Sequence, residues 1–119
     1  MPTRADLLRA RTKRFGFDVI NLVKQLPRNV AAECVARQLI RAGTGVASNH
    51  RAACRGRSRR EFIAKLGVVL EEADESELWL EALIVCELAP RLPVDQLLRE
   101  AGELRAIFSQ SLKTMRAHL

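Results

Sequence analysis

Apolar residues recur at intervals of three and four along four long stretches of this chain, and short polar breaks separate the stretches. The breaks lie at residues 26–29, 55–58 and 89–93, and each contains proline or glycine. Strand-like alternation and Asn-Gly turns are both missing. The pattern therefore predicts four helices of about 22 to 30 residues and no strands.

The first helix is expected to begin near Arg4, and the second to run from about Val30 to Cys54. Ser58 and Glu61 have the spacing of a capping box, which predicts the start of the third helix. Asp95, shortly after Pro93, is the predicted N-cap of the fourth. The apolar stripes predict the core: Leu8, Phe15, Val19, Leu22, Val23, Leu26; Val35, Leu39, Ala42, Val46, Ala53; Phe62, Leu66, Val69, Ala73, Leu80, Ile84; Leu98, Ala101, Leu104, Phe108, Leu112 and Met115.

A chain of 119 residues is long enough for one domain and too short for two, so residues 1–119 are expected to form one unit. Four amphipathic segments with short connections predict an all-α fold, an antiparallel up-down-up-down four-helix bundle. The second helix is rich in small residues that share one side, which predicts close helix packing there: Ala32, Ala36, Gly43, Ala47 and Cys54.

Charge is distributed unevenly along the chain. Residues 1–60 hold 14 Lys and Arg against 3 Asp and Glu, a net charge of +11, and residues 61–119 hold 6 against 11, a net of −5. The whole chain carries +6. Such asymmetry indicates either a surface for polyanions or two halves that neutralise each other.

An arginine stripe follows the polar side of the second helix and continues into the next connection. Thr44 and Ser48 lie within it at helical spacing, and its arginines are Arg37, Arg41, Arg51, Arg55, Arg57, Arg59 and Arg60. Guanidinium groups bind phosphate in a bidentate manner, so the stripe is a candidate nucleic-acid surface. The alternative is that carboxylates of the third helix neutralise these arginines, within one chain or between chains.

The third helix has a second stripe away from its predicted core face. It contains Val68, Glu72, Glu75 and Trp79, the last being the only tryptophan of the chain. A lone bundle would expose this face, and an exposed large aromatic residue typically marks a protein interface. The alternative is that Trp79 lies under neighbouring side chains.

Candidates for metal binding and catalysis are incomplete. His50 and Cys54 stand one helical turn apart and supply at most two ligands, without a second pair. The acidic cluster from Glu71 to Glu75 lacks the Glu-x-x-His repeats of di-iron bundles. We therefore expect no metal, no cofactor and no enzymatic activity; an enzyme that uses His50 is the weakest hypothesis.

Other features of the sequence indicate the cellular location and the kind of nucleic-acid contact. Three cysteines, an odd number within helical patterns, are expected to be reduced and buried, as in a cytoplasmic protein. No apolar run approaches the length of a membrane span, so we expect a cytoplasmic location without a membrane partner. Aromatic residues make up 4% of the chain, which argues for contacts to phosphates rather than stacked bases.

Two segments together resemble a known family. The first comprises residues 41–55 (RAGTGVASNHRAACR). The second comprises residues 58–67 (SRREFIAKLG), the acidic residues within 71–75, and Trp79-Leu80-Glu81. They are similar to the second and third helices, respectively, of bacterial four-helix-bundle proteins related to those encoded in 23S rRNA intervening sequences. His50 stands where tyrosine is common in that family.

The resemblance implies an antiparallel bundle that assembles into a ring, typically a homopentamer. A similar pentameric barrel is the accessory protein of diversity-generating retroelements, where it binds nucleic acid and the reverse transcriptase. On this basis we expect a non-catalytic, homo-oligomeric accessory protein that binds nucleic acid, RNA rather than DNA. The alternative is a protein-interaction scaffold whose arginines are paired with third-helix carboxylates.

Overall fold

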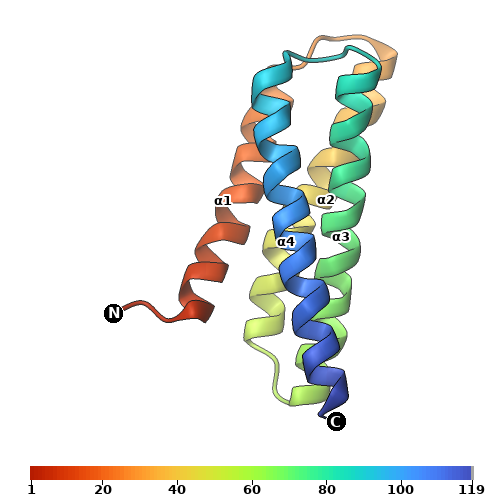
Figure 1. Ribbon diagram of the computed structural model, residues 1–119. Coiled ribbons are helices and arrows are strands. Elements are labelled where there is room, and N and C mark those ends of the chain that lie inside the picture. Colours follow the sequence, from red (N-terminus) through yellow and green to blue (C-terminus); the bar gives the residue numbers. More distant parts are fainter. Residues whose placement is uncertain (119) are drawn as a thin grey trace.

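The computed structural model describes residues 1–118, which form four antiparallel helices joined by short connections (Figure 1). They are α1 (Arg4–Lys24), α2 (Val30–Cys54), α3 (Arg59–Val85) and α4 (Arg91–Ala117). The chain runs up, down, up and down, so the α2–α3 connection and both chain termini lie in the same half of the bundle (Figure 1). The α1–α2 and α3–α4 connections lie in the other half. The predicted all-α four-helix fold is confirmed.

Side chains cap the first three helices at their N-termini. Thr3 and Asp6 form a complete capping box on α1, and the Asn29 side chain accepts a hydrogen bond from the N–H of Ala32. Ser58 accepts from the N–H of Glu61, as its spacing predicts. The Glu61 carboxylate, however, accepts from the N–H of Arg57 at 3.4 Å rather than from that of Ser58.

The predicted start of the fourth helix is wrong. α4 begins at Arg91, and Pro93 lies inside its first turn. Proline is tolerated there because the first N–H groups of a helix have no partner within it. Asp95 is therefore not the N-cap; its carboxylate pairs with Arg91 one turn earlier, at 3.4 Å.

The core contains most of the predicted stripe residues. Leu8, Val23, Leu26, Phe62, Ile84, Leu98 and Met115 are only partly buried and pack against its edge. The prediction missed buried positions on α3 and α4, namely Ile63, Ser76, Leu83, Val94 and Leu97. α3 packs between α2 and α4, and α4 contacts both α3 and α1, so the buried arc of each of these helices is wider than a single stripe.

Two glycines bring α1 and α2 into close contact. A Cβ atom added at Gly43 would lie 2.8 Å from Cγ2 of Val19, and one added at Gly16 would lie 3.1 Å from Cβ of Ala47. Carbon atoms of side chains do not approach as closely as 2.8 Å, so only glycine fits at position 43. The prediction that small residues on the second helix allow close packing is confirmed at this crossing.

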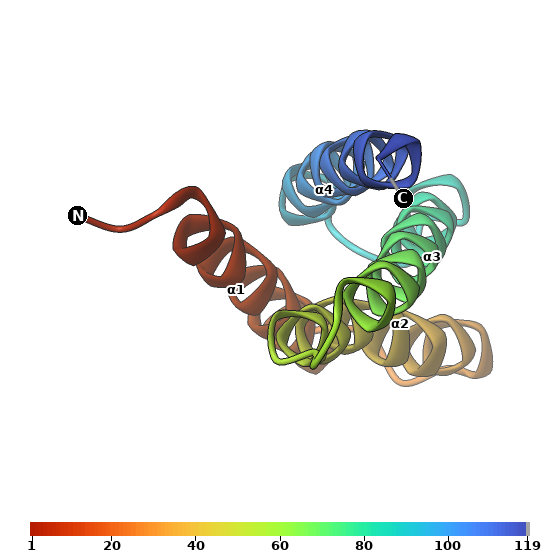
Figure 2. The ribbon, with the colours of Figure 1, turned by 90° about the horizontal axis from the view of Figure 1, so that it is seen from below.

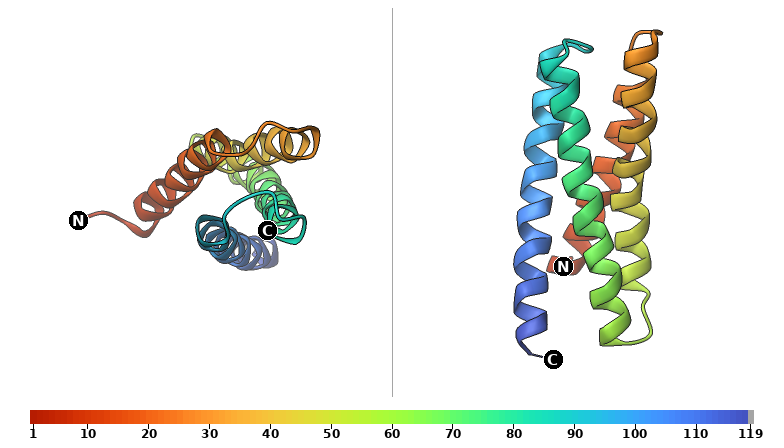
Figure 3. Two further views of the ribbon diagram at one scale, coloured as in Figure 1. Left: turned by 90° about the horizontal axis from the view of Figure 1, so that it is seen from above. Right: turned by 90° about the vertical axis from the view of Figure 1, so that its right-hand side faces the viewer.

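The bundle is open along one side. α1 packs on α2, α2 on α3 and α3 on α4, whereas α1 contacts α4 only sparsely. Seen from either end, α1 diverges from α4 toward its N-terminus (Figures 2 and 3). An ion pair of 2.5 Å between Arg11 Nη2 and Glu100 Oε1 spans this side.

The cysteines differ from expectation. Cys34 and Cys86 are exposed, Cys54 is half-buried, and all three are unpaired thiols. The expectation that they are buried is wrong for the first two, because Cys34 lies on the outer side of α2 and Cys86 follows the end of α3.

Within residues 1–118, none of the helices combines the length and the apolar character that crossing a membrane requires.

The α1–α2 crossing gives a stability prediction. Gly43→Ala should lower the free energy of unfolding by about 1–3 kcal/mol, because the new methyl group overlaps Val19. Gly67→Ala is the matched control: its Cβ would have Arg116 Nη2 at 3.9 Å as its nearest neighbour. That change should stabilise the protein by about 0.5–1 kcal/mol, since alanine favours helix. Urea unfolding measures both, and a Gly43→Ala variant as stable as Gly67→Ala would contradict the packing argument.

Candidate nucleic-acid interface

The seven arginines of the predicted stripe are all exposed, but they fall into two groups. Arg37 and Arg41 lie in the first half of α2. Arg51 lies in its last turn, Arg55 directly after it, Arg57 in the connection, and Arg59 and Arg60 in the first turn of α3. Ten residues of helix separate Arg41 from Arg51, a distance of about 15 Å. The stripe is therefore a cluster at one end of the bundle with two outlying members.

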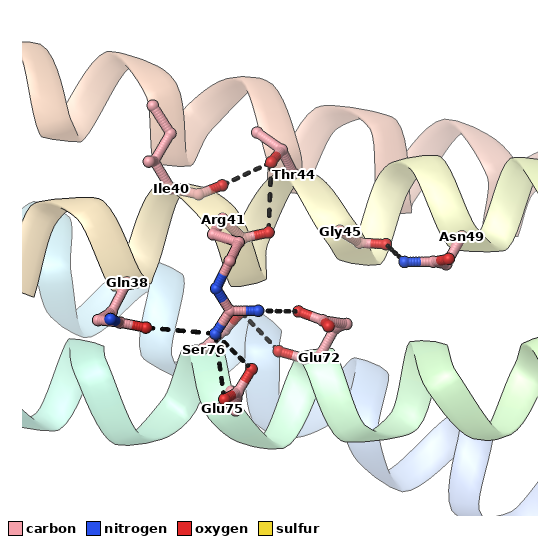
Figure 4. Close-up of polar contacts among 9 residues, drawn as sticks. All are labelled: Gln38, Ile40, Arg41, Thr44, Gly45, Asn49, Glu72, Glu75 and Ser76. Atoms are coloured by element: carbon pink, nitrogen blue, oxygen red, sulfur yellow. Dashed lines mark hydrogen bonds and ion pairs between the residues drawn. The ribbon is translucent and has the colours of Figure 1, made fainter.

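Arg41 is neutralised within the chain. Its Nη2 donates to both carboxylate oxygens of Glu75, at 3.0 and 3.2 Å, and to Oε1 of Gln38 at 3.3 Å (Figure 4). Its Nη1 lies 3.7 Å from Oε2 of Glu72. Thr44, counted with the stripe, donates its hydroxyl hydrogen to the Ile40 carbonyl at 2.6 Å. A phosphate at this place would therefore have to compete with Glu72 and Glu75 for the Arg41 guanidinium and with the Ile40 carbonyl for the Thr44 hydroxyl.

The predicted interface stripe on α3 faces α2 in part. Glu72 and Glu75 contact Arg41, and an added Cβ at Gly45 would lie 2.9 Å from Oε2 of Glu72. Burial, and next the charge of Glu75, raise the pKa of Glu72. These two carboxylates thus have a structural role within one chain, whatever role they have between chains.

Trp79 and Val68 are half-buried. Trp79 packs against the core, and its indole N–H is buried without a hydrogen-bond partner among the residues described. The expectation that a lone bundle exposes Trp79 is wrong: one turn beyond Glu75, it lies on the α2 side of α3.

The other six arginines make no ion pair with any carboxylate of residues 1–118: Arg37, Arg51, Arg55, Arg57, Arg59 and Arg60. Antiparallel packing explains this. Glu72 and Glu75 lie beside Arg41, so the part of α3 beside Arg51 and Arg55 is its beginning. That beginning contains a single carboxylate, Glu61. The acidic half of α3 is therefore held away from the arginine cluster.

The topology adds basic residues that the stripe omitted. The first half of α1 and the last turns of α4 lie at the same end as the α2–α3 connection (Figure 1). We call this the basic end and define it by residues 1–14, 51–65 and 110–118. Asp6 and Glu61 are its only acidic side chains. Up-down-up-down topology predicts this gathering; the missed basic residues are Arg4, Arg9, Arg11, Lys13, Arg14, Lys65, Lys113 and Arg116.

His50 is buried behind the basic end. Its Nδ1 lies 3.2 Å from Oγ1 of Thr12, its Nε2 lies 3.8 Å from Sγ of Cys54, and its ring centroid lies 5.4 Å from that of Phe108. The Thr12 hydroxyl donates to the Arg9 carbonyl at 3.1 Å, so it accepts from Nδ1–H of His50. Residues 1–118 contain no group of three His, Cys, Asp or Glu side chains arranged to hold a metal ion.

These features define a class of protein: a small antiparallel four-helix bundle with one strongly cationic end. The family model of the 23S rRNA-intervening sequence proteins matches residues 8–110, and the chain belongs to that family. The predicted resemblance is confirmed.

A solved structure supports the assignment. It is a protein of unknown function from the S23 ribosomal protein family of Bacteroides thetaiotaomicron, with 28% sequence identity and a TM-score of 0.80. The match covers 93% of this chain and 99% of that chain. No curated protein matches the chain significantly.

The burial of His50 predicts a dependence of stability on pH. Burial, and then the charge of Arg9, lower the pKa of His50 below its ordinary value of 6.5. As the pH falls below 6.5, the unfolded chain takes up a proton that the folded chain resists, so the free energy of unfolding should decrease. The loss should level off below the folded-state pKa.

His50→Gln tests this prediction, because glutamine does not titrate. Between about pH 7.5 and about pH 5.5, urea unfolding of the wild type should lose more stability than that of the variant. Equal losses in the two proteins would show that His50 does not contribute. His118 is exposed and present in both, so it cancels in the comparison.

Proposed function

We propose that this protein is a non-catalytic, homo-oligomeric RNA-binding accessory protein of the cytoplasm, and that its basic end contacts RNA phosphates. One observation carries the proposal: six exposed arginines of the stripe have no carboxylate partner within residues 1–118. Five of them lie at the basic end. Unpaired guanidinium groups on one surface attract a polyanion and release its counterions on binding.

Family membership supports RNA over DNA. The family is named for intervening sequences of 23S rRNA, and the solved relative is assigned to a ribosomal protein family. The resemblance described above also supports a ring of subunits, with five as the proposed number. Several copies of the basic end in one particle would strengthen binding through multivalency.

The buried imidazole supports the absence of catalysis in this proposal. Both ring nitrogens of His50 face partners inside the bundle, Thr12 and Cys54, so the ring is not positioned to take a proton from a substrate.

A second candidate function is a protein-interaction scaffold whose arginines are paired with carboxylates. The Arg41 contacts with Glu72 and Glu75 favour it, because they are the pairing that this hypothesis expects. It requires the remaining six arginines to find carboxylates on another chain.

Charge reversal at the basic end tests the RNA proposal. The triple variant Arg51→Glu, Arg55→Glu, Arg59→Glu should abolish binding to structured RNA, as measured by fluorescence anisotropy. Residual binding at low salt should show a log–log salt slope reduced by about three, one unit for each lost phosphate contact. The bundle should stay folded, because all three side chains are exposed and glutamate at the start of α3 favours the helix.

A control variant carries the same change in net charge elsewhere. Lys24→Glu, Arg28→Glu, Arg99→Glu alters exposed cations outside the basic end. It should retain most of the affinity of the wild type. Equal loss in both triple variants would reveal only a net-charge effect, and unchanged affinity in the first would refute the proposal. A first variant that dissociates or unfolds the particle would favour the scaffold.

Light scattering tests the assembly. The wild type should have a mass of five chains of 13.3 kDa each. Trp79→Ala should reduce this mass while circular dichroism still reports a helical fold, if the stripe of Val68, Glu72, Glu75 and Trp79 contributes to the interface. A monomeric wild type would refute the ring, and a Trp79→Ala particle of unchanged mass would remove Trp79 from the interface.

A further inference from the structure

A pocket lies between α1 and α2 on the side of their crossing that leads toward the basic end. Its volume is about 640 Å³, within the range of small-molecule sites. Residues from Arg9 to Phe17 line it from α1, and residues from Thr44 to Arg55 line it from α2. Gly16 lies at its inner edge, where the two helices approach most closely.

The lining is cationic without a carboxylate. It contains Arg9, Lys13, Arg51 and Arg55, and no Asp or Glu. Arg9 pairs with Asp6, whereas the other three cations make no ion pair within residues 1–118. A second cavity, between α1 and α4, differs in this respect because Asp18 and Glu100 stand beside Arg14. Of these two cavities, only the α1–α2 pocket has the charge to hold an anion.

Besides the cations, the lining contains three small apolar residues, five polar ones (Thr12, Thr44, Ser48, His50 and Cys54) and one phenylalanine. Gly16, Ala10 and Ala47 leave room between the helices. Phe17 is 54% exposed, in contrast to Phe15 and Phe108 in the core. Nζ of Lys13 lies 5.9 Å from the centroid of the Phe17 ring. The hydroxyl of Ser48 has no hydrogen-bond partner among the residues described and also lines the pocket.

We propose that this pocket holds one unstacked nucleotide of single-stranded RNA. The base lies against the Phe17 ring, and Arg51, Arg55 and Lys13 bind the adjoining phosphates. An aromatic face beside cations is the combination with which proteins bind single strands. This inference rests on the proposed function and adds a stacking contact to the phosphate contacts of the basic end. A paired base is stacked inside its duplex, so the pocket distinguishes single strands from duplexes.

Phe17→Ala separates the two kinds of contact. Affinity for a single-stranded RNA of about ten nucleotides should fall about tenfold, the usual effect of removing one stacking aromatic residue. Affinity for duplex RNA should not change. The salt slope should also stay the same, because no phosphate contact is lost. Phe17→Trp, which keeps an aromatic face, should retain the affinity for the single strand.

The chain offers a matched control on another helix. Leu78 of α3 is 54% exposed, as Phe17 is, and lies outside both the pocket and the basic end. Leu78→Ala should leave both affinities at the level of the wild type, and each variant is checked for mass by light scattering. Adenosine monophosphate is titrated in parallel as a free nucleotide.

The outcomes distinguish this inference from the function on which it rests. If the arginine triple variant loses RNA while Phe17→Ala binds single strands as the wild type does, the pocket proposal is wrong and the basic end stands. If the triple variant binds normally, the pocket proposal and the basic-end proposal both fail.

Two results would assign the pocket another role. A Phe17→Ala particle of lower mass with unchanged RNA affinity would make the pocket an interface between copies. Binding of adenosine monophosphate that depends on Phe17, without an effect on RNA, would make it a small-molecule site; either result overturns the inference.

Discussion

The close approach of α1 and α2 at Gly43 and Val19 determines the rest of the arrangement. Where no side chain separates the two backbones, the helices touch, and beyond that point they diverge. Because α1 is held to α2 at this crossing, it meets α4 only sparsely and leaves that side of the bundle open. The same divergence creates the pocket that Arg51, Arg55 and Phe17 share. One missing methyl group thus sets the shape of the surface that extends from the crossing toward Arg51 and Arg55.

The antiparallel direction of α2 and α3 keeps most carboxylates of α3 away from the arginines at the end of α2. Carboxylates concentrate in the middle and second half of α3, which lies beside the first half of α2, and Glu77 pairs with Arg105 of α4. The arginines after residue 50 lie beside the start of α3, where acidic residues are scarce. Within the arginine stripe, ion pairing inside the chain is therefore limited to Arg41. A sequence with the same composition but with its acidic residues at the start of α3 would have no basic end.

The helices, their order and their packing could be predicted from the sequence because the signals are local. The capping residues Thr3, Asn29 and Ser58 and the apolar period fix the first three helices, and small residues mark the α1–α2 contact. The start of α4 could not be predicted as well, since proline fits inside a first turn as readily as before one. Trp79 was misplaced because helical spacing alone does not tell which face of α3 meets α2. Phe17 and its pocket depend on the divergence of two helices, which no local pattern encodes.

Both chain termini lie in the half of the bundle that contains the α2–α3 connection, and the N-terminus points away to the side of α1 (Figures 1 and 2). A purification tag or fluorescent fusion at either terminus would therefore stand next to the cationic surface, and a polyhistidine or acidic tag there would alter its field directly. The α1–α2 and α3–α4 connections point the opposite way. For labelling, the residues near Arg28 and Glu87 are the better attachment points, and the exposed thiol of Cys86 already offers one for maleimide dyes.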